Sequence, residues 1–120
     1  AAAVMVSNQI VALADMGTAL LVKCGFSEAA AAEALSPLLL GNAQSVAEKG
    51  AVNALTGPIE RGDAQTVSKH LQEIRKFAAE STVGQDILTA YTALSKQLIR
   101  IAQQKHPQKD YKHLEKELEQ

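Results

Sequence analysis

Apolar residues recur along this chain with the period of an α-helix, and nowhere do they alternate with the period of two that marks a strand. Residues 64–80 carry Val67, Leu71, Ile74 and Ala78, spaced by four, three and four. This spacing places the four side chains on one face of a helix. A second repeat of the same kind, over residues 85–105, consists of Ile87, Tyr91, Leu94, Leu98 and Ile101. The pattern predicts an all-α fold, a multi-helix bundle.

Residues 2–23 predict a long first helix that is apolar nearly all round, since Asp15 is its only charge before Lys23. We expect such a helix to be buried on most sides, in a core or against another subunit. Polar residues inside the stretch, including Asn8 and Thr18, make it a poor membrane span, so no membrane partner is expected. The stretch starts apolar with no capping residue ahead of it, which predicts a helix cut out of a longer protein.

Helix-breaking and capping residues set the remaining boundaries. Pro37 should split the next helix into pieces at 28–35 and 37–49, because proline removes a helical hydrogen bond. Residues 51–62 contain two glycines and a proline and predict a loop. Asp63 should cap the helix at 64–80, and residues 81–84 form a short connection. A last helix at 109–119, docked or frayed, should align Tyr111, Leu114 and Leu118 on one side.

Composition, charge and cysteine count exclude several classes of partner and site. The 120 residues predict a single domain, and only 3% are aromatic, so its core must be built from aliphatic side chains. A net charge of −1 leaves no basic field, so nucleic acid is not expected as a partner. The single cysteine, Cys24, excludes an internal disulfide, fits a reducing, cytoplasmic setting and is expected in the core. No histidine pair has metal-ligand spacing, and no metal site is expected.

The strongest candidate for chemistry is the loop from Leu55 to Asp63. Its glycines allow close approach of a ligand, and its proline stiffens the turn. The following helix start offers backbone N–H groups, which, together with an arginine and a threonine hydroxyl, suit an anionic group. Alternatively the loop is an ordinary link whose aspartate satisfies those N–H groups as a cap. The candidate substrate-binding residues are Thr56, Gly57, Pro58, Arg61 and Asp63.

Two further polar residues are candidates for catalysis. His70 flanks the apolar stripe of residues 64–80, where it could donate a proton to a carbonyl or imine, or could simply lie at the core edge. Asn8 lies seven residues before Asp15, nearly on the same face of the first helix. Its amide could bind a substrate or nicotinamide, or a neighbouring helix. His106 and His113 are expected in solvent, within a charged segment.

Four motifs together resemble one family: S-N at 7–8, P-L-L-L-G-N at 37–42, A-L-T-G-P-I-E-R-G-D at 54–63 and T-V-S-K-H-L at 66–71. They resemble the C-terminal helical domain of Rossmann-type oxidoreductases related to pyrroline-5-carboxylate reductase, ketopantoate reductase and 6-phosphogluconate dehydrogenase. The subgroup is one whose C-terminal domain is a domain of unknown function. The resemblance covers about residues 1–75.

This resemblance implies a two-domain enzyme that uses NADP or NAD on a small carbonyl or imine. An N-terminal Rossmann domain, absent from this chain, would bind the cofactor, since the seven glycines here never form G-x-G-x-x-G. The helical domain would bind the substrate and form a homodimer. In pyrroline-5-carboxylate reductases the corresponding loop holds the substrate carboxylate, but it reads serine-proline-glycine-glycine there. The different sequence at 56–63 leaves the substrate open.

Two other functions remain compatible with the sequence. A non-catalytic helical dimerisation or scaffold module would explain the apolar helices equally well. A small-anion-binding domain would use the same loop without any reaction. These alternatives differ in what the loss of Arg61 should do: it should leave a scaffold unaffected, whereas it should weaken a binding site or an enzyme.

Overall fold

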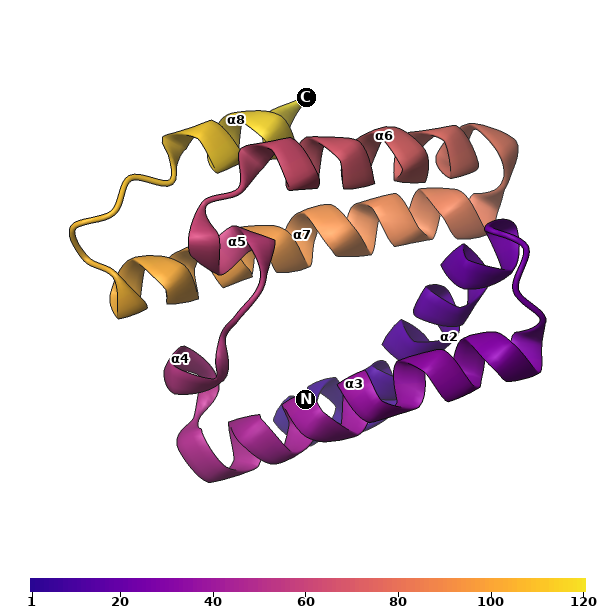
Figure 1. The fold of residues 1–120 in the computed structure, drawn as a ribbon, viewed down its shortest axis with the longest axis horizontal. Helices are drawn as coiled ribbons and strands as arrows, with labels where there is room; N and C mark the ends of the chain where they lie inside the picture. The colour runs from indigo at the N-terminus through magenta and orange to yellow at the C-terminus, as the bar shows by residue number, and fades with distance from the viewer. The chain divides into compact units, whose positions relative to one another are not determined.

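Every regular element of the chain is an α-helix, which confirms the predicted all-α class (Figure 1). The computed structural model describes all 120 residues, and these divide into two units, residues 1–48 and 49–120. The helices are α1 (Ala2–Met5), α2 (Asn8–Lys23), α3 (Glu28–Lys49), α4 (Ala51–Ala54), α5 (Pro58–Arg61), α6 (Ala64–Glu80), α7 (Thr82–Lys105) and α8 (Lys112–Glu119).

Unit 1 consists of α1, α2 and most of α3. The prediction of one unbroken helix over 2–23 was wrong, because the helix is interrupted at Val6 and Ser7. There the Ser7 hydroxyl donates a hydrogen bond to the Ala3 carbonyl, four residues back, and Ser7 itself has a non-helical backbone. A serine side chain that bonds backbone groups in this way competes with helical hydrogen bonding. The first helix therefore starts as a separate short turn.

The predicted break at Pro37 was also wrong. The α3 helix runs through Pro37 without interruption, from Glu28 to Lys49. Proline in a helix interior costs about 3 kcal/mol, through one missing hydrogen bond and a steric clash. In a helix of 22 residues, hydrogen bonding on both sides of the proline offsets that cost. Gly50 ends α3 with a positive φ of 80°, as expected for a glycine at a helix end.

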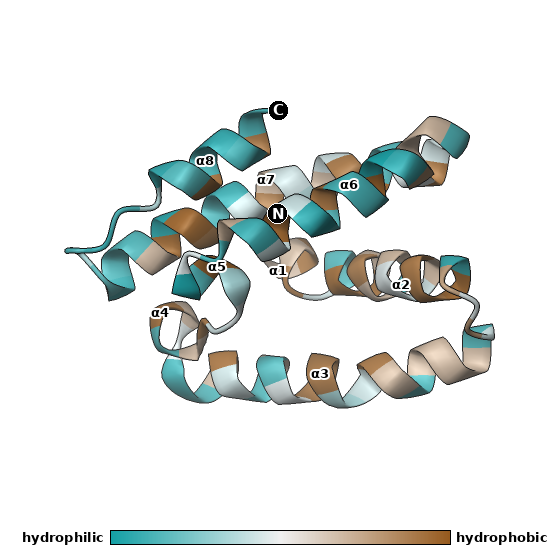
Figure 2. Ribbon diagram, turned by 45° about the horizontal axis from the view of Figure 1, so that its top comes forward, coloured by the Kyte–Doolittle hydropathy of each residue, from teal (hydrophilic) through white to brown (hydrophobic).

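Apolar residues make up much of α2 (brown in Figure 2), and several large apolar side chains of unit 1 are exposed. No residue of α1 or α2 is buried within the chain, so the first helix does not lie in a core of this chain, and its burial against another subunit stays a prediction. Cys24, expected in the core, is exposed at the end of α2. Residues 2–23 are long and apolar enough to cross a membrane by length and composition alone, a property shared with core helices and signal sequences.

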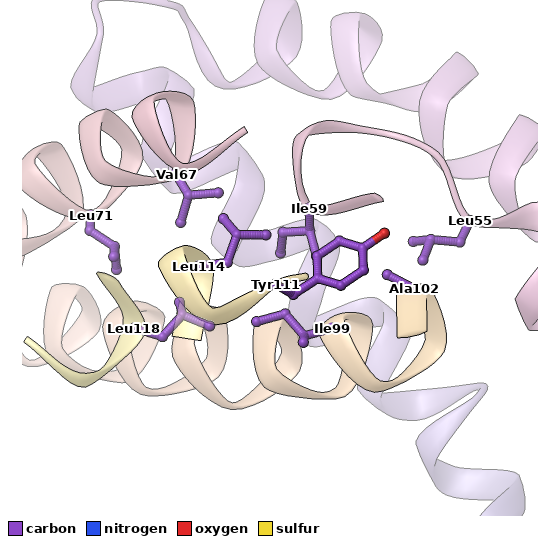
Figure 3. Packing of buried hydrophobic residues seen from close by; sticks show 9 residues of the cluster. All are labelled: Leu55, Ile59, Val67, Leu71, Ile99, Ala102, Tyr111, Leu114 and Leu118. Atoms are coloured by element: carbon purple, nitrogen blue, oxygen red, sulfur yellow. The ribbon is translucent and has the colours of Figure 1, made fainter. Parts of the chain in front are cut away.

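The core of unit 2 lies where α6, α7 and α8 meet, with α5 packed against α6 and α7 (Figure 1). Val67 and Leu71 of α6 are fully buried, which confirms the stripe predicted for that helix. The α8 helix is docked rather than frayed, because its apolar side chains pack into the same cluster (Figure 3). The buried cluster consists of Leu55, Ile59, Val67, Leu71, Ile99, Ala102, Tyr111, Leu114 and Leu118.

The buried face of α7 differs from the predicted one. Leu94, expected in the core, is 44% exposed, whereas Ser95 beside it is only 3% exposed. The apolar stripe of α7 is broad, and a buried serine is not recognised by a search for apolar residues. The predicted face was therefore centred about one residue before the buried one. Tyr91 lies at its edge and is half-buried. The buried residues of α7 are Gly84, Ile87, Ser95, Ile99 and Ala102.

A single residue, Ser81, links α6 to α7, so the predicted connection over 81–84 was too long. The Ser81 side chain accepts a hydrogen bond of 3.0 Å from the N–H of Gly84, which starts α7 at Thr82. Gly84 in turn lies against the backbone of Phe77: a Cβ atom on it would be only 2.3 Å from the Phe77 carbonyl oxygen. The close approach of α6 and α7 at this turn therefore requires glycine at position 84.

Candidate functional site

The loop that carries the candidate binding residues is more ordered than predicted. Residues 51–54 and 58–61 each form one helical turn, α4 and α5, where the sequence predicted only loop. Gly57 begins α5 with a φ of +100°, and Gly62 ends it in the left-handed region at +73°. These angles are strained for other residues, so both glycines are required by the turn. Pro58, at the first position of α5, suits its fixed φ.

Two apolar side chains fix the loop to the core of unit 2. Leu55 is 8% exposed and Ile59 is 5% exposed, and both belong to the buried cluster (Figure 3). Between them, Thr56 is exposed at the surface. The loop therefore has an inner side that packs and an outer side that solvent or a ligand can reach.

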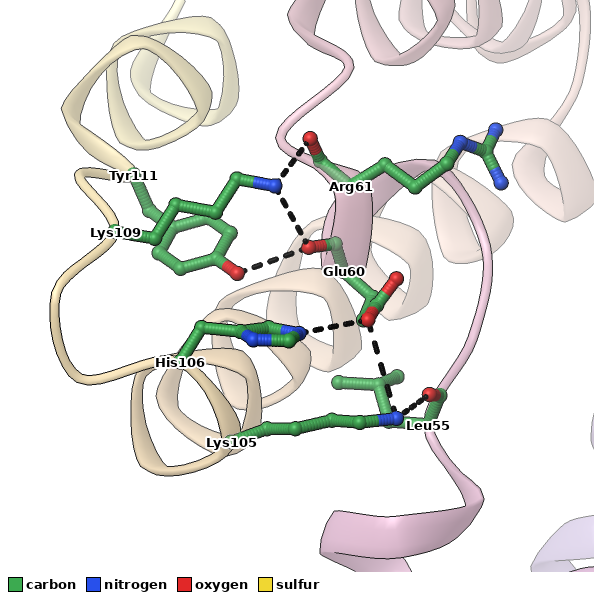
Figure 4. Close-up of polar contacts among 7 residues, drawn as sticks. All are labelled: Leu55, Glu60, Arg61, Lys105, His106, Lys109 and Tyr111. Atoms are coloured by element: carbon green, nitrogen blue, oxygen red, sulfur yellow. Dashed lines mark hydrogen bonds and ion pairs between the residues drawn. The ribbon is translucent and has the colours of Figure 1, made fainter.

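Side chains from residues 105–111 also hold this loop, by hydrogen bonds to its backbone carbonyls (Figure 4). The Lys105 ammonium donates to the Leu55 carbonyl at 2.8 Å, and the Lys109 ammonium donates to the Arg61 carbonyl at 2.7 Å. The Tyr111 hydroxyl donates to the Glu60 carbonyl at 2.9 Å. Burial and the nearby Glu60 carboxylate raise the pKa of Tyr111, which keeps its hydroxyl protonated as a donor. We call these three side chains the carbonyl clamp.

Glu60 is the charged centre of this cluster. Its carboxylate lies 2.8 Å from Nε2 of His106 and 3.9 Å from the Lys105 ammonium. The expectation that His106 would lie in solvent was therefore wrong, whereas His113 is exposed as expected. The hydrogen bond with His106 is the main cause that lowers the pKa of Glu60 below its ordinary 4.5, and the nearby Lys105 charge adds to it.

The stability of unit 2 should consequently fall as the pH drops below about 4.5, the ordinary value for Glu60. A carboxyl whose pKa is lower in the folded state stabilises the fold above its unfolded value, and this contribution is lost as the pH falls through the folded value. The pKa of Asp63 is lowered too, chiefly by hydrogen bonds from Thr66. Urea unfolding between pH 3 and 7 should show a shallower acid loss for Glu60→Gln than for the unchanged chain. An identical pH profile would contradict the assignment.

The start of α6 is already occupied by Asp63. Its carboxylate accepts a hydrogen bond of 3.0 Å from the Thr66 N–H and one of 2.7 Å from the Thr66 hydroxyl. This confirms the predicted cap. It also places a negative charge where the sequence suggested free N–H groups for an anion, because capping uses those groups. Contact between Asp63 and a substrate stays a prediction.

Arg61 leaves its guanidinium available to a ligand. The side chain is 59% exposed and extends away from the carbonyl clamp (Figure 4). Its nearest acid is Asp63, at 3.9 Å, too long for a hydrogen bond. An exposed ion pair of this length contributes little. The clamp therefore holds the backbone of Arg61 while its side chain remains free to bind a carboxylate or phosphate.

His70, the catalytic candidate of unit 2, lies on α6 with an exposed ring. Its Nδ1 atom is 3.0 Å from the hydroxyl of Tyr91 on α7. Asn8, the other catalytic candidate, is exposed at the start of α2 in unit 1, beside the Ser7 hydroxyl at 3.3 Å. The structure thus brings His70 together with a tyrosine and the loop together with a lysine-rich segment. The roles of these residues toward a substrate stay predictions.

Sequence reasoning did not identify the residues that hold the loop. Tyr111 was assigned to the buried side of the last helix, which indicated that this segment would dock. Lys105, His106 and Lys109 gave no signal, because they look like ordinary solvated charges at the end of a helix and just beyond it. No group of histidine, cysteine and acidic side chains in the structure could hold a metal ion.

Comparison with known proteins gives one result. Residues 1–98 match the family model described as "Domain of unknown function (DUF2520)". The matched range includes the candidate loop, His70 and Tyr91, and it ends before the carbonyl clamp. No curated protein and no solved structure matches the chain.

Proposed function

The chain belongs to the DUF2520 family, and from that premise we propose that it is the substrate-binding and dimerising part of an NAD(P)-dependent oxidoreductase. The proposed fold is that of the C-terminal domain of 6-phosphogluconate dehydrogenase and its relatives. The proposed substrate is a small carbonyl or imine that carries an anionic group. Support comes from the motifs at 54–63 and 66–71 and from the chemistry of the loop.

The observation that carries the proposal is the exposed guanidinium of Arg61 on a fixed loop, where its ion pair with Asp63 is long, at 3.9 Å. Arginine can bind a carboxylate or phosphate through two parallel hydrogen bonds, which also orients the bound group. Orientation of this kind requires a backbone that does not move, and both the buried Leu55 and Ile59 and the carbonyl clamp provide it. Thr56, exposed on the same loop, adds a hydroxyl that can donate or accept.

The cofactor would be bound elsewhere in the enzyme. None of the seven glycines of this chain lies in a G-x-G-x-x-G sequence, and no strand is present to precede one. The 120 residues therefore do not fit a dinucleotide site, and we place it on an N-terminal Rossmann domain. The coding sequence before residue 1 tests this directly: it should encode a strand followed by that glycine pattern. A start codon there would overturn the two-domain proposal.

Homodimerisation would proceed through unit 1. Its helices leave large apolar side chains exposed, among them Val11 at 70% and Leu40 at 71%. A largely apolar groove of about 350 Å³ lies between α2 and α3, lined in part by Leu13, Leu35 and Leu39. Exposed apolar surface of this kind favours association with another protein surface. A second copy of the chain is the partner that the resemblance implies.

Replacing Arg61 with alanine should lower kcat/KM of the complete enzyme about 10- to 100-fold, the usual cost of one charge-assisted contact. The matched control is Arg100→Ala, which removes an exposed guanidinium from α7 that bonds Gln97. Arg61→Lys should recover only part of the loss, since lysine cannot form the two parallel bonds.

Steady-state rates with 2-keto acids and cyclic imines, together with circular dichroism of each variant, measure the effect. Unchanged turnover in a folded Arg61→Ala protein would favour the scaffold module instead. Anion binding by calorimetry, with no turnover in the unchanged enzyme, would favour the binding domain.

A further inference from the structure

His70 and Tyr91 form a contact between α6 and α7 that the proposed function does not yet use. Nδ1 of His70 lies 3.0 Å from the Tyr91 hydroxyl, and the rings meet edge to face at 88° with their centroids 6.0 Å apart. Tyr91 is half-buried at the edge of the core, whereas the histidine ring is exposed. The tyrosine is therefore the more firmly fixed member of the pair.

The chemistry of the two groups fixes the direction of this hydrogen bond. A neutral imidazole has one nitrogen that donates and one that accepts, and its partners select which is which. A phenol is a far stronger acid than a neutral imidazole N–H, and imidazole nitrogen is a better acceptor than phenol oxygen. The favourable arrangement has the Tyr91 hydroxyl donating to Nδ1. The proton of the neutral imidazole then resides on Nε2.

The surroundings of Tyr91 support this direction. Burial is the main cause that raises the pKa of Tyr91, so the hydroxyl keeps its proton at neutral pH. The buried Ser95 side chain acts in the opposite sense and lowers that pKa, but burial outweighs it. The protonated hydroxyl is thus available to donate to Nδ1 of His70, 3.0 Å away.

We propose that Tyr91 is a positioning residue that holds neutral His70 with its proton on Nε2, as a hydrogen-bond donor to the substrate. The use of that donor on a substrate rests on the proposed function. It also narrows the substrate class. A carbonyl oxygen has lone pairs that accept from an N–H and gains negative charge during reduction, whereas a protonated imine has no lone pair. The pair therefore favours a carbonyl substrate over an imine.

Nitrogen NMR on the 120-residue chain tests the positioning without any reaction. The two nitrogens of a neutral imidazole give distinct shifts, so spectra recorded at an alkaline pH of about 8.5 report which nitrogen carries the proton. His70 should show a protonated Nε2 and a hydrogen-bonded Nδ1. His113, exposed on α8, serves as the internal reference for an unrestrained ring.

Tyr91→Phe should move the Nδ1 signal of His70 toward that of His113. The matched control is Tyr111→Phe, which removes the only other tyrosine hydroxyl and should leave the His70 signals unchanged. A proton on Nδ1 of His70, or His70 signals that match His113 in the unchanged chain, would overturn the inference. So would a folded Tyr91→Phe chain with unaltered His70 signals.

Activity separates this inference from the proposed function. In the complete enzyme Tyr91→Phe should reduce kcat for a carbonyl substrate about tenfold, with KM little changed. If the NMR result holds but His70→Gln leaves turnover intact, the proposed catalytic use of His70 fails and the tautomer assignment stands. If turnover depends on His70 but Tyr91→Phe has no effect on its signals, the positioning role fails alone.

Discussion

Gly84→Ala is expected to destabilise unit 2 by about 3 kcal/mol or more, since the new methyl group meets backbone that cannot move aside. Its Cβ would lie 2.3 Å from the Phe77 carbonyl oxygen, 2.4 Å from the Phe77 carbonyl carbon and 2.6 Å from the Ala78 nitrogen. Alanine in a helix otherwise gains about 1 kcal/mol over glycine. The steric term is larger here, because separating α6 from α7 would open the core next to Ile87.

Urea unfolding monitored by circular dichroism measures this effect. The local control is Val83→Ala, which shortens a side chain that is 50% exposed at the neighbouring position. A second comparison is Gly41→Ala in α3, where a Cβ atom meets nothing within 4 Å and alanine should be neutral or stabilising. Equal stabilities for Gly84→Ala and the unchanged chain would show that the two helices do not approach as closely as described.

Leu114→Ala is expected to cost about 3 kcal/mol, within the usual range for truncating a fully buried leucine. Leu114 of α8 is 1% exposed and belongs to the buried cluster that also contains Val67 and Ile99. Because α8 is held largely by this residue, Tyr111 and Leu118, the cavity should weaken its attachment first. If α8 detaches in this variant, the loss in free energy of unfolding cannot exceed the free energy with which α8 is docked.

Hydrogen exchange of the α8 amides, alongside urea unfolding, distinguishes local release from global loss. In Leu114→Ala the α8 amides should exchange faster than those of α6. His113→Ala, at the exposed neighbouring position, should change the stability by less than about 0.5 kcal/mol. Slow α8 exchange in the Leu114→Ala chain would contradict the view that this side chain anchors the helix.

The local patterns of the sequence predicted the helices better than their boundaries. The stripe of α6 and the Asp63 cap were confirmed, because each depends only on residues within one helix and its first turn. The boundary errors at Ser7 and Pro37 arose where two local preferences opposed each other and the weaker one was taken as decisive. A serine that bonds the backbone interrupted a helix that apolar periodicity would have continued, and a long helix outweighed its proline.

The candidate site was less predictable, because its geometry depends on contacts between distant residues. Arg61 and the glycines around it could be selected from the loop sequence alone. The carbonyl clamp joins residues about fifty positions apart, and nothing in a lysine indicates that its ammonium will bond a remote carbonyl. The contact of His70 with Tyr91 similarly spans 21 positions, across two helices whose facing sides the sequence specified only approximately.

The one-residue link at Ser81 has a consequence for how this protein can vary. In an α-helix each residue advances the chain by about 100° around the axis. Adding or deleting one residue between α6 and α7 would turn all of α7 by that angle if both helices kept their ends. Ile87 and Ile99 would then face water, and Tyr91 would leave His70. Natural and engineered length changes should therefore be absent from this corner, where the length of the link sets the rotation of α7 relative to α6.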